Sequence, residues 1–232
     1  MKKLLTFLTL PFLFFNFSSD SGDCDRLIFF KEGSTTTLTN YDGNGKLMGS
    51  NTLSFKNIAK TAKGVKVTAV SQHFDKKGKA TSSSEIFLRC EDGTLYFDMN
   101  TMLGEMGEAY KDFNVTIEGI NKEIPSNLEV GKILNDAEIK VSVKTKDGTP
   151  MPMMDMLVKI FNRKVEAIES VTSPAGTWEC YKISEDTEMK SIIKVKSKST
   201  TWFSYDVGMV KTETYDDKGK LTGRTLLTAI TK

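Results

Sequence analysis

Histidine is the first residue type to test for chemistry, because the chain holds one copy, His73. A serine-type hydrolase needs a histidine base, and His73 would have to supply it. Ser71 and Gln72 precede it, but nothing around them has the pattern of a nucleophile elbow. We therefore expect His73 to be a surface residue near the end of a strand, and we expect no enzyme. A hydrolase that uses His73 is a weaker alternative.

Metal-binding patterns are also weak. One histidine and three scattered cysteines give no zinc spacing, and the acidic turns lack the ligand ladder of a calcium loop. The run from Met151 to Met156 contains four methionines, and clustered thioethers select Cu(I). Methionine also fills irregular gaps in cores, so Met154 and Met156 are expected inside, with Met151 and Met153 in a loop. We predict no metal and no cofactor.

Apolar side chains give the most specific binding hypothesis. Flexible methionines and rigid aromatics on a helix that lies across a curved sheet can hold a hydrophobic guest. The residues expected to line such a groove are Met102, Met106, Tyr110, Met154 and Met156. The alternative is a filled core without a ligand.

Charged residues define one further surface. A stripe of lysines is predicted along one strand, at Lys190, Lys194, Lys196 and Lys198. It is either a solvated face or a contact with an anionic surface or polysaccharide. The formal net charge is only +2, so no global field favours nucleic acid.

The elements that position these residues are mainly hairpins. One turn motif, an aromatic residue, Asp, two further residues, Gly and Lys, occurs at residues 41–46, 74–79 and 215–220. The Asp side chain can cap its own turn, and the glycine supplies a positive φ. Between the turns, apolar residues alternate with polar ones, as in Ile139, Val141 and Val143. Alternation also predicts a strand through Met154, Met156 and Ile160, and another that runs from Lys190 to Lys198.

A helix is predicted at residues 101–113, where Met102, Met106, Tyr110 and Phe113 recur every three or four positions. Ten or more strands and this one short helix give an all-β fold. We expect a single antiparallel, strongly curved sheet or barrel, because open sheet edges promote aggregation.

The first residues predict export. Lys2 and Lys3 precede an apolar run at residues 4–17, and small residues follow. This is the pattern of a cleaved secretory signal peptide at residues 1–21, and it leaves one β-rich domain at residues 22–232. The expected location is periplasmic or secreted. Lipidation at Cys24 is less favoured, because an acidic residue, Asp23, comes directly before it.

Three cysteines, Cys24, Cys90 and Cys180, are expected in an oxidising compartment, where a disulfide is the default. Cys90 shares a predicted inward face with Ile86 and Leu88, and Cys24 lies on an N-terminal tail that needs an anchor. We predict a Cys24–Cys90 bridge, which would stabilise the fold by about 4 kcal/mol in the chain-entropy model. Cys180 would then be a buried free thiol. A Cys90–Cys180 bridge would contradict this assignment.

Several stretches resemble the TapB-like secreted proteins, a family of exported domains of Gram-negative bacteria. The resemblance spans nearly the whole mature chain and rests on residues 125–128, 130–131, 162–165, 174–183 (PAGTWECYKI) and 202–213 (WFSYDVGMVKTE). It implies a spiral β-roll or barrel similar to the lipoprotein-carrier architecture. It implies no activity and no functional residues.

Together these observations predict an exported, non-catalytic β-domain that binds an apolar or lipid-like ligand. The alternative is a structural or protein-interaction module of the cell envelope without a ligand cavity. The expected partners are a lipid or apolar small molecule, or an envelope protein, and the chain is expected to be a monomer that binds no nucleic acid.

Overall fold

Strands make up nearly all of the regular structure in the computed structural model, which describes residues 27, 30–98 and 112–231. The sheet has 13 strands. They are β1 (Thr35–Asp42), β2 (Leu47–Thr61), β3 (Gly64–Asp75), β4 (Ala80–Glu91), β5 (Thr94–Phe97), β6 (Asn114–Ile120), β7 (Lys122–Pro125), β8 (Ala137–Lys144), β9 (Met156–Ser173), β10 (Gly176–Lys190), β11 (Lys194–Ser204), β12 (Gly208–Asp216) and β13 (Leu221–Thr231).

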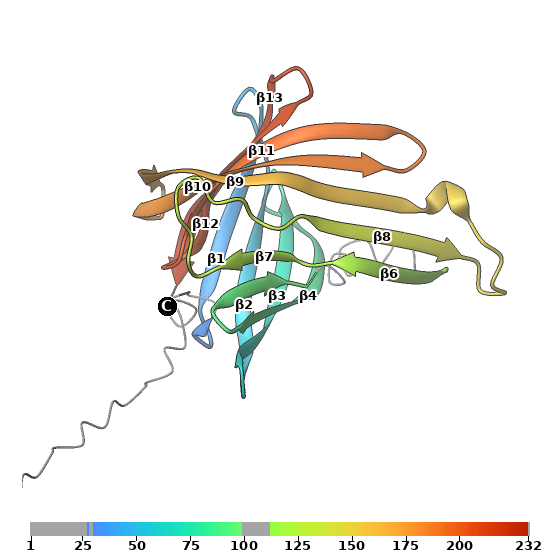
Figure 1. Ribbon diagram of the computed structural model, residues 1–232, viewed down its shortest axis with the longest axis horizontal. Helices are drawn as coiled ribbons and strands as arrows, with labels where there is room; N and C mark the ends of the chain where they lie inside the picture. Colours follow the sequence, from blue (N-terminus) through green and yellow to red (C-terminus); the bar gives the residue numbers. More distant parts are fainter. Residues whose placement is uncertain (1–26, 28–29, 99–111, 232) are drawn as a thin grey trace, which may run out of the picture.

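All described strand pairs are antiparallel, in the order β6-β8-β9-β10-β11-β12-β13-β1-β2-β3-β4-β5-β7. The long strands β9 to β11 run at a steep angle to β1 to β4, which shows how strongly the sheet twists and curls (Figure 1). The two edge strands, β6 and β7, are separated in sequence only by Asn121. The curled sheet is therefore a nearly closed barrel, and the prediction of an all-β, antiparallel, strongly curved fold is confirmed.

The connection between β7 and β8 helps to close the barrel. Strand β8 covers the first residues of β9, up to Ile160. Beyond Ile160, the loop between β7 and β8 forms hydrogen bonds with β9 in place of β8. Leu134 N donates to Arg163 O at 2.9 Å, and Val165 N donates to Lys132 O at 2.9 Å. These bonds satisfy backbone groups that would otherwise form an open edge.

Three apolar clusters follow from the alternation of side chains along the strands. The largest packs Phe55, Val67, Leu95 and Phe203 from the two halves of the sheet against one another. A second cluster surrounds Trp202 and Val210. In the third, the alternating residues Ile139, Val141 and Val143 of β8 are buried, as the sequence predicts.

The repeated turn motif forms as predicted. In the β1–β2 turn, Asp42 Oδ1 accepts from the backbone N of Asn44 and of Lys46, each at 2.9 Å. The turns after β3 and β12 make the same bonds to Asp75 and Asp216. The glycine of each motif has a positive φ, between 77° and 83°, at Gly45, Gly78 and Gly219.

Two predicted strands have different limits. Residues Pro152–Met154 form a 3-10 turn, with proline at its start, so Met154 does not belong to the strand, which begins at Met156. The predicted strand from Lys190 to Lys198 is interrupted, because a tight turn at residues 191–193 connects β10 to β11. The predicted helix at residues 101–113 lies outside the described residues except for Asp112 and Phe113, which are not helical.

In the described part of the chain, no helix is long and apolar enough to span a membrane.

Candidate functional site

An apolar cavity of about 390 Å³ opens between the two halves of the sheet. It is walled by side chains from β1, β2, β4 and β5 on one side and from β11, β12 and β13 on the other. Most of the described lining residues are apolar: Leu38, Leu53, Ile86, Phe87, Leu88, Phe97, Ile124, Phe203, Val207, Met209 and Leu227. The polar ones include Thr36, Asp98, Lys122 and Thr201.

The period of two along each strand places these groups in the cavity. Thr36 and Leu38 lie two apart on β1, and Ile86 and Leu88 lie two apart on β4. Phe203 comes from β11 across the barrel and is 2% exposed. The lining is therefore continuous with the largest core cluster, and the cavity is an unfilled part of the barrel interior.

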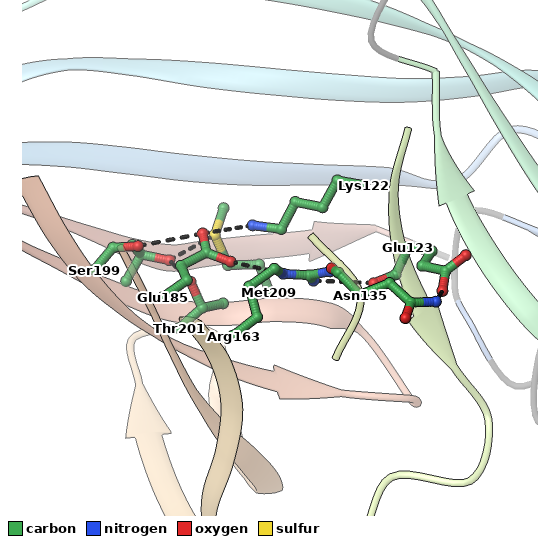
Figure 2. Close-up of polar contacts among 9 residues, drawn as sticks. Lys122, Glu123, Asn135, Arg163, Glu185, Ser199, Thr201 and Met209 are labelled. Atoms are coloured by element: carbon green, nitrogen blue, oxygen red, sulfur yellow. Dashed lines mark hydrogen bonds and ion pairs between the residues drawn. The ribbon is translucent and has the colours of Figure 1, made fainter. Parts of the chain in front are cut away.

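A charged network stands beside this cavity and comes from strands that lie far apart in the sheet order (Figure 2). Lys122 of β7 places its Nζ 2.6 Å from Glu185 Oε1, and Arg163 of β9 places its Nε 3.3 Å from Glu185 Oε2. Ser199 Oγ donates to Glu185 Oε1 at 3.2 Å. Glu185 therefore accepts from three different strands.

Arg163 is fully buried, with 0% of its side chain exposed. Its two remaining nitrogens donate to backbone carbonyls, Nη1 to Asn135 O at 2.6 Å and Nη2 to Glu123 O at 3.0 Å. The planar guanidinium thus joins β9 to β7 and to the loop before β8. Every side of this buried cation has a partner, which is the condition for burying a charge.

Burial and charge oppose each other in this network. Burial lowers the pKa of Lys122 below its ordinary value, against the opposing effect of Glu185. Burial alone would raise the pKa of Glu185, but the ammonium of Lys122 and the guanidinium of Arg163 outweigh it and hold that pKa below its ordinary value. Glu185 is therefore ionised at neutral pH.

A bulge in β9 explains why Arg163 and Glu185 both point inward. The pairing of β9 with β10 skips from Lys164↔Ser184 to Phe161↔Asp186, so Asn162 and Arg163 lie opposite Glu185 alone. Asn162 has φ of 54°, in the left-handed region that asparagine tolerates better than most residues. Its amide donates to Asp186 Oδ2 at 2.8 Å, which holds the bulge.

The residues predicted to line a groove lie partly elsewhere. Met154 and Met156 pack against the third cluster, with Ile139, Val141 and Val143, and do not line the apolar cavity. Met102, Met106 and Tyr110 lie outside the described residues. Neither the residues that line the cavity nor the inward position of Arg163 is predicted by the sequence pattern. Their strands were predicted, but no sequence signal says how two strands distant in sequence face each other.

His73 and the possible metal ligands are the remaining candidates from the sequence. His73, on β3, is half-buried, and Ser71 Oγ lies 3.2 Å from its Nε2. Ser71 is fully buried and also donates to Asn51, so its hydroxyl presents no surface to a substrate. In the described residues, no group of histidine, cysteine and carboxylate side chains is close enough together to hold a metal ion.

Two of the three cysteines, Cys90 and Cys180, lie among the described residues. Cys180 is buried and free, as predicted. Cys90 is also buried, on β4, while Cys24 lies outside the described residues, so the Cys24–Cys90 bridge stays a prediction.

Comparisons with known proteins show a family and a fold. A crystal structure of a candidate exported protein with a YmcC-like fold from Bacteroides fragilis NCTC 9343 matches at a TM-score of 0.70 and 22% identity, over 87% of this chain and 97% of that chain. A crystal structure of a candidate lipoprotein from Parabacteroides distasonis ATCC 8503 matches at a TM-score of 0.69 and 23% identity, over 88% of this chain and 99% of that chain. At these identities the likeness establishes the fold alone.

No curated protein matches the chain. A family model described as DUF3108-like matches residues 31–227, which include 12 complete strands of the sheet and most of β13. The narrower TapB-like resemblance is not confirmed. On the extent of this match, the chain belongs to the DUF3108-like family.

Proposed function

We propose that this chain is an exported, non-catalytic β-domain that binds one apolar, lipid-like molecule inside its barrel. The observation that carries the proposal is the cavity of about 390 Å³ with its mainly apolar lining. Its size lies within the range of small-molecule sites, roughly 300–1,000 Å³. A site with so few polar groups selects a ligand by the apolar surface that it buries.

Lys122 and Thr201 give the cavity a polar side, since both lie in its lining. The Lys122 side chain keeps 24% of its surface exposed while it pairs with Glu185. A ligand with an alkyl or ring body and one polar end fits this arrangement. No metal or cofactor is part of the proposal.

The proposed location is the periplasm or the exterior of the cell, after cleavage of residues 1–21. The apolar run at residues 4–17 supports this, as do two structural relatives that are described as a candidate exported protein and a candidate lipoprotein. Export also supplies the oxidising conditions for the Cys24–Cys90 bridge.

Mass spectrometry of the protein from its native host tests processing and the disulfide together. The intact mass should lack about twenty residues, which is the usual length of a signal peptide. Non-reducing peptide mapping should recover a peptide pair joined through Cys24 and Cys90, with Cys180 free. A species that retains Met1, or a Cys90–Cys180 pair, would contradict these assignments.

The alternative function is a structural or protein-interaction module of the cell envelope that works through its surface as a monomer. The two proposals differ in whether the cavity must stay open. A variant that fills the cavity without adding charge therefore separates them.

Ile86→Trp is the variant of choice, because Ile86 lines the cavity and is only partly buried. Protein purified natively should carry a lipid that mass spectrometry detects, and an apolar fluorescent dye should displace it. In Ile86→Trp we expect dye affinity to fall by roughly tenfold or more, because the indole occupies the ligand volume. Thermal stability should hold or rise, since an apolar void is filled.

Ile168→Trp is the matched control, because Ile168 is 44% exposed on β9 and does not line the cavity. It should bind dye like the native chain. Leu53→Trp, in the same lining, repeats the test if Ile86→Trp does not fold. Native protein without lipid or dye binding would favour the interaction module, and a catalytic activity abolished by His73→Ala would overturn both proposals.

A further inference from the structure

The turn between β10 and β11 carries two isoleucines that the fold does not bury. Strand β10 ends at Lys190 and β11 begins at Lys194, and Ser191 N donates to Ile193 O at 3.0 Å across the turn. Ile192 is 72% exposed and Ile193 is 67% exposed. Tight hairpin turns favour Gly, Asn and Asp, so two isoleucines here serve neither the turn nor the core.

Other apolar groups gather at the same end of the sheet. Figure 1 shows the β10–β11 turn, in orange, at the free end of its long strands, near the yellow turn that precedes β9. Met153, which is 70% exposed, lies in that second turn. Among the described residues, three of the four most exposed large apolar side chains therefore lie at this end.

The exposed turn continues into an apolar row on one face of the sheet. Val195 of β11 lies directly opposite Met189 of β10, which lies opposite Val158 of β9, which lies opposite Ile139 of β8. Residues in register share a face, so this row links the exposed turn to the third cluster. Val195 itself is 41% exposed.

Lysines flank the same turn. Residues 188–196 contain three lysines and one glutamate, a net charge of +2. Lys190 and Lys194 lie directly opposite each other, an arrangement of like charges that destabilises a strand pair. Glu188 offsets part of this repulsion, because its Oε1 lies 2.8 Å from Lys194 Nζ. Glu188 Oε2 also lies 3.9 Å from Lys196 Nζ, so this one carboxylate faces two of the three exposed lysines and the turn keeps a net positive charge toward the solvent.

A lipid bilayer with anionic headgroups fits both features. The turn protrudes, and its three residues, 191–193, offer far less surface than a stable protein interface needs. At a bilayer, isoleucine side chains enter the boundary between headgroups and acyl chains, while lysine stems let the ammonium groups stay at the level of the phosphates.

From this geometry we infer that the β10–β11 turn, with Ile192 and Ile193 at its tip, docks the barrel on an anionic membrane surface. The inference does not depend on a ligand in the cavity. It assigns the chain an interaction surface, with negatively charged lipid as the partner.

The test is vesicle flotation with the chain expressed without residues 1–21, all of which lie before the described sheet. Native chain should bind vesicles of phosphatidylethanolamine mixed with phosphatidylglycerol, and bind phosphatidylcholine vesicles more weakly. The double variant Ile192→Ser, Ile193→Ser should lower the partition onto the anionic vesicles by roughly tenfold or more, because two apolar side chains no longer enter the interface.

Three further variants separate the contributions. Ile133→Ser removes a side chain that is 68% exposed in the loop after β7, and it should bind vesicles like the native chain. Lys190→Gln with Lys194→Gln should lose the preference for anionic vesicles, as should added salt, which screens exposed charges. Ile193→Trp should be quenched by brominated lipid in the same vesicles.

The inference is overturned if the native chain does not bind anionic vesicles, or if the serine double variant binds them equally well. It is also overturned if sedimentation shows a dimer that the serine variant dissociates, because a second copy of the chain would then cover the turn. Thermal unfolding of each variant checks that its barrel is intact, which is expected because the changed residues are exposed.

Discussion

Glu185 lies between two cations, Lys122 and Arg163, and is the described carboxylate that pairs with both of them. Its side chain is 8% exposed, so water does little to screen the cations if the carboxylate is removed. Removing one partner of a buried ion pair costs much more than the pair itself contributes, because an uncompensated charge remains. The stability of this network therefore depends on the ionised state of Glu185.

Glu185→Gln should lower the free energy of unfolding at neutral pH by about 3–5 kcal/mol, the usual cost of breaking a buried pair. The pKa of Glu185 is lowered in the folded state from 4.5, so its contribution is present above 4.5 and is lost as pH falls through the folded pKa. The difference between native and variant chains should therefore shrink in acid. Urea unfolding at neutral pH and near pH 3 measures both effects.

Glu166→Gln is the matched control. Glu166 also has a lowered pKa, from its hydrogen bonds with Ser184 and Lys164, but it is 37% exposed. Its loss should cost at most about 1 kcal/mol, as for other surface pairs. Two results would contradict this role of Glu185. One is an equal loss of unfolding free energy in both variants, and the other is a difference between the native chain and Glu185→Gln that persists unchanged in acid.

Cys180 shows a different effect of burial on a single residue. Burial raises the pKa of its thiol to about 12, and the carboxylates of Glu169 and Glu179 add to the effect. The thiol is therefore protonated at neutral pH and is a poor nucleophile. The sequence predicts the free, buried state from the pairing of the other two cysteines, but not the acidic neighbours.

At the scale of elements, local signals were predictive where one residue determines the backbone. The three Asp turns form as expected, because the Asp side chain and the glycine φ act within six residues. The alternation in β8 likewise predicts its buried face. Both signals are independent of what the element packs against.

Elements were mispredicted where the local signal was weak. The turn at residues 191–193 contains no glycine, proline or asparagine, so apolar alternation ran through it unbroken. The bulge at Asn162 has no signal except one asparagine, although it turns Arg163 inward and so forms the charged network. Such features depend on pairing with a distant strand, which periodicity within one strand does not report.

At the scale of the whole molecule, the curved sheet is predictable but its cavity is not. Ten or more alternating strands require a curled sheet, because edges must be covered. The position of the cavity depends on which residues of β1 to β5 face those of β11 to β13, and that depends on the register of the intervening strands. The bulges in this register, such as the one between Trp202 and Phe203, decide which side chains reach the interior.

The closure of the barrel is a property of the whole molecule that rests on few contacts. Strand β7 is an edge of the sheet and pairs with β5. Tyr205 also reaches it, donating from its hydroxyl to Pro125 O at 2.6 Å, while its ring packs edge-on against Tyr181 and Phe203. With Arg163 and Lys122, this bond ties the edge strand to the opposite half of the sheet.

Tyr205→Phe should loosen the closure without changing the packing, because it keeps the ring and removes only the hydroxyl. Leaving the half-buried Pro125 carbonyl without its donor costs about 1–3 kcal/mol. If this bond holds the edge, hydrogen exchange of the backbone amides of β5 and β7 should accelerate by roughly tenfold, while those of β9 and β10 change little, because the opening is local. Tyr215→Phe, which removes a hydroxyl bonded to Glu213 within one strand at 2.6 Å, should leave exchange in β5 and β7 unchanged. Uniform acceleration over the whole sheet would show instead that the barrel opens only by global unfolding.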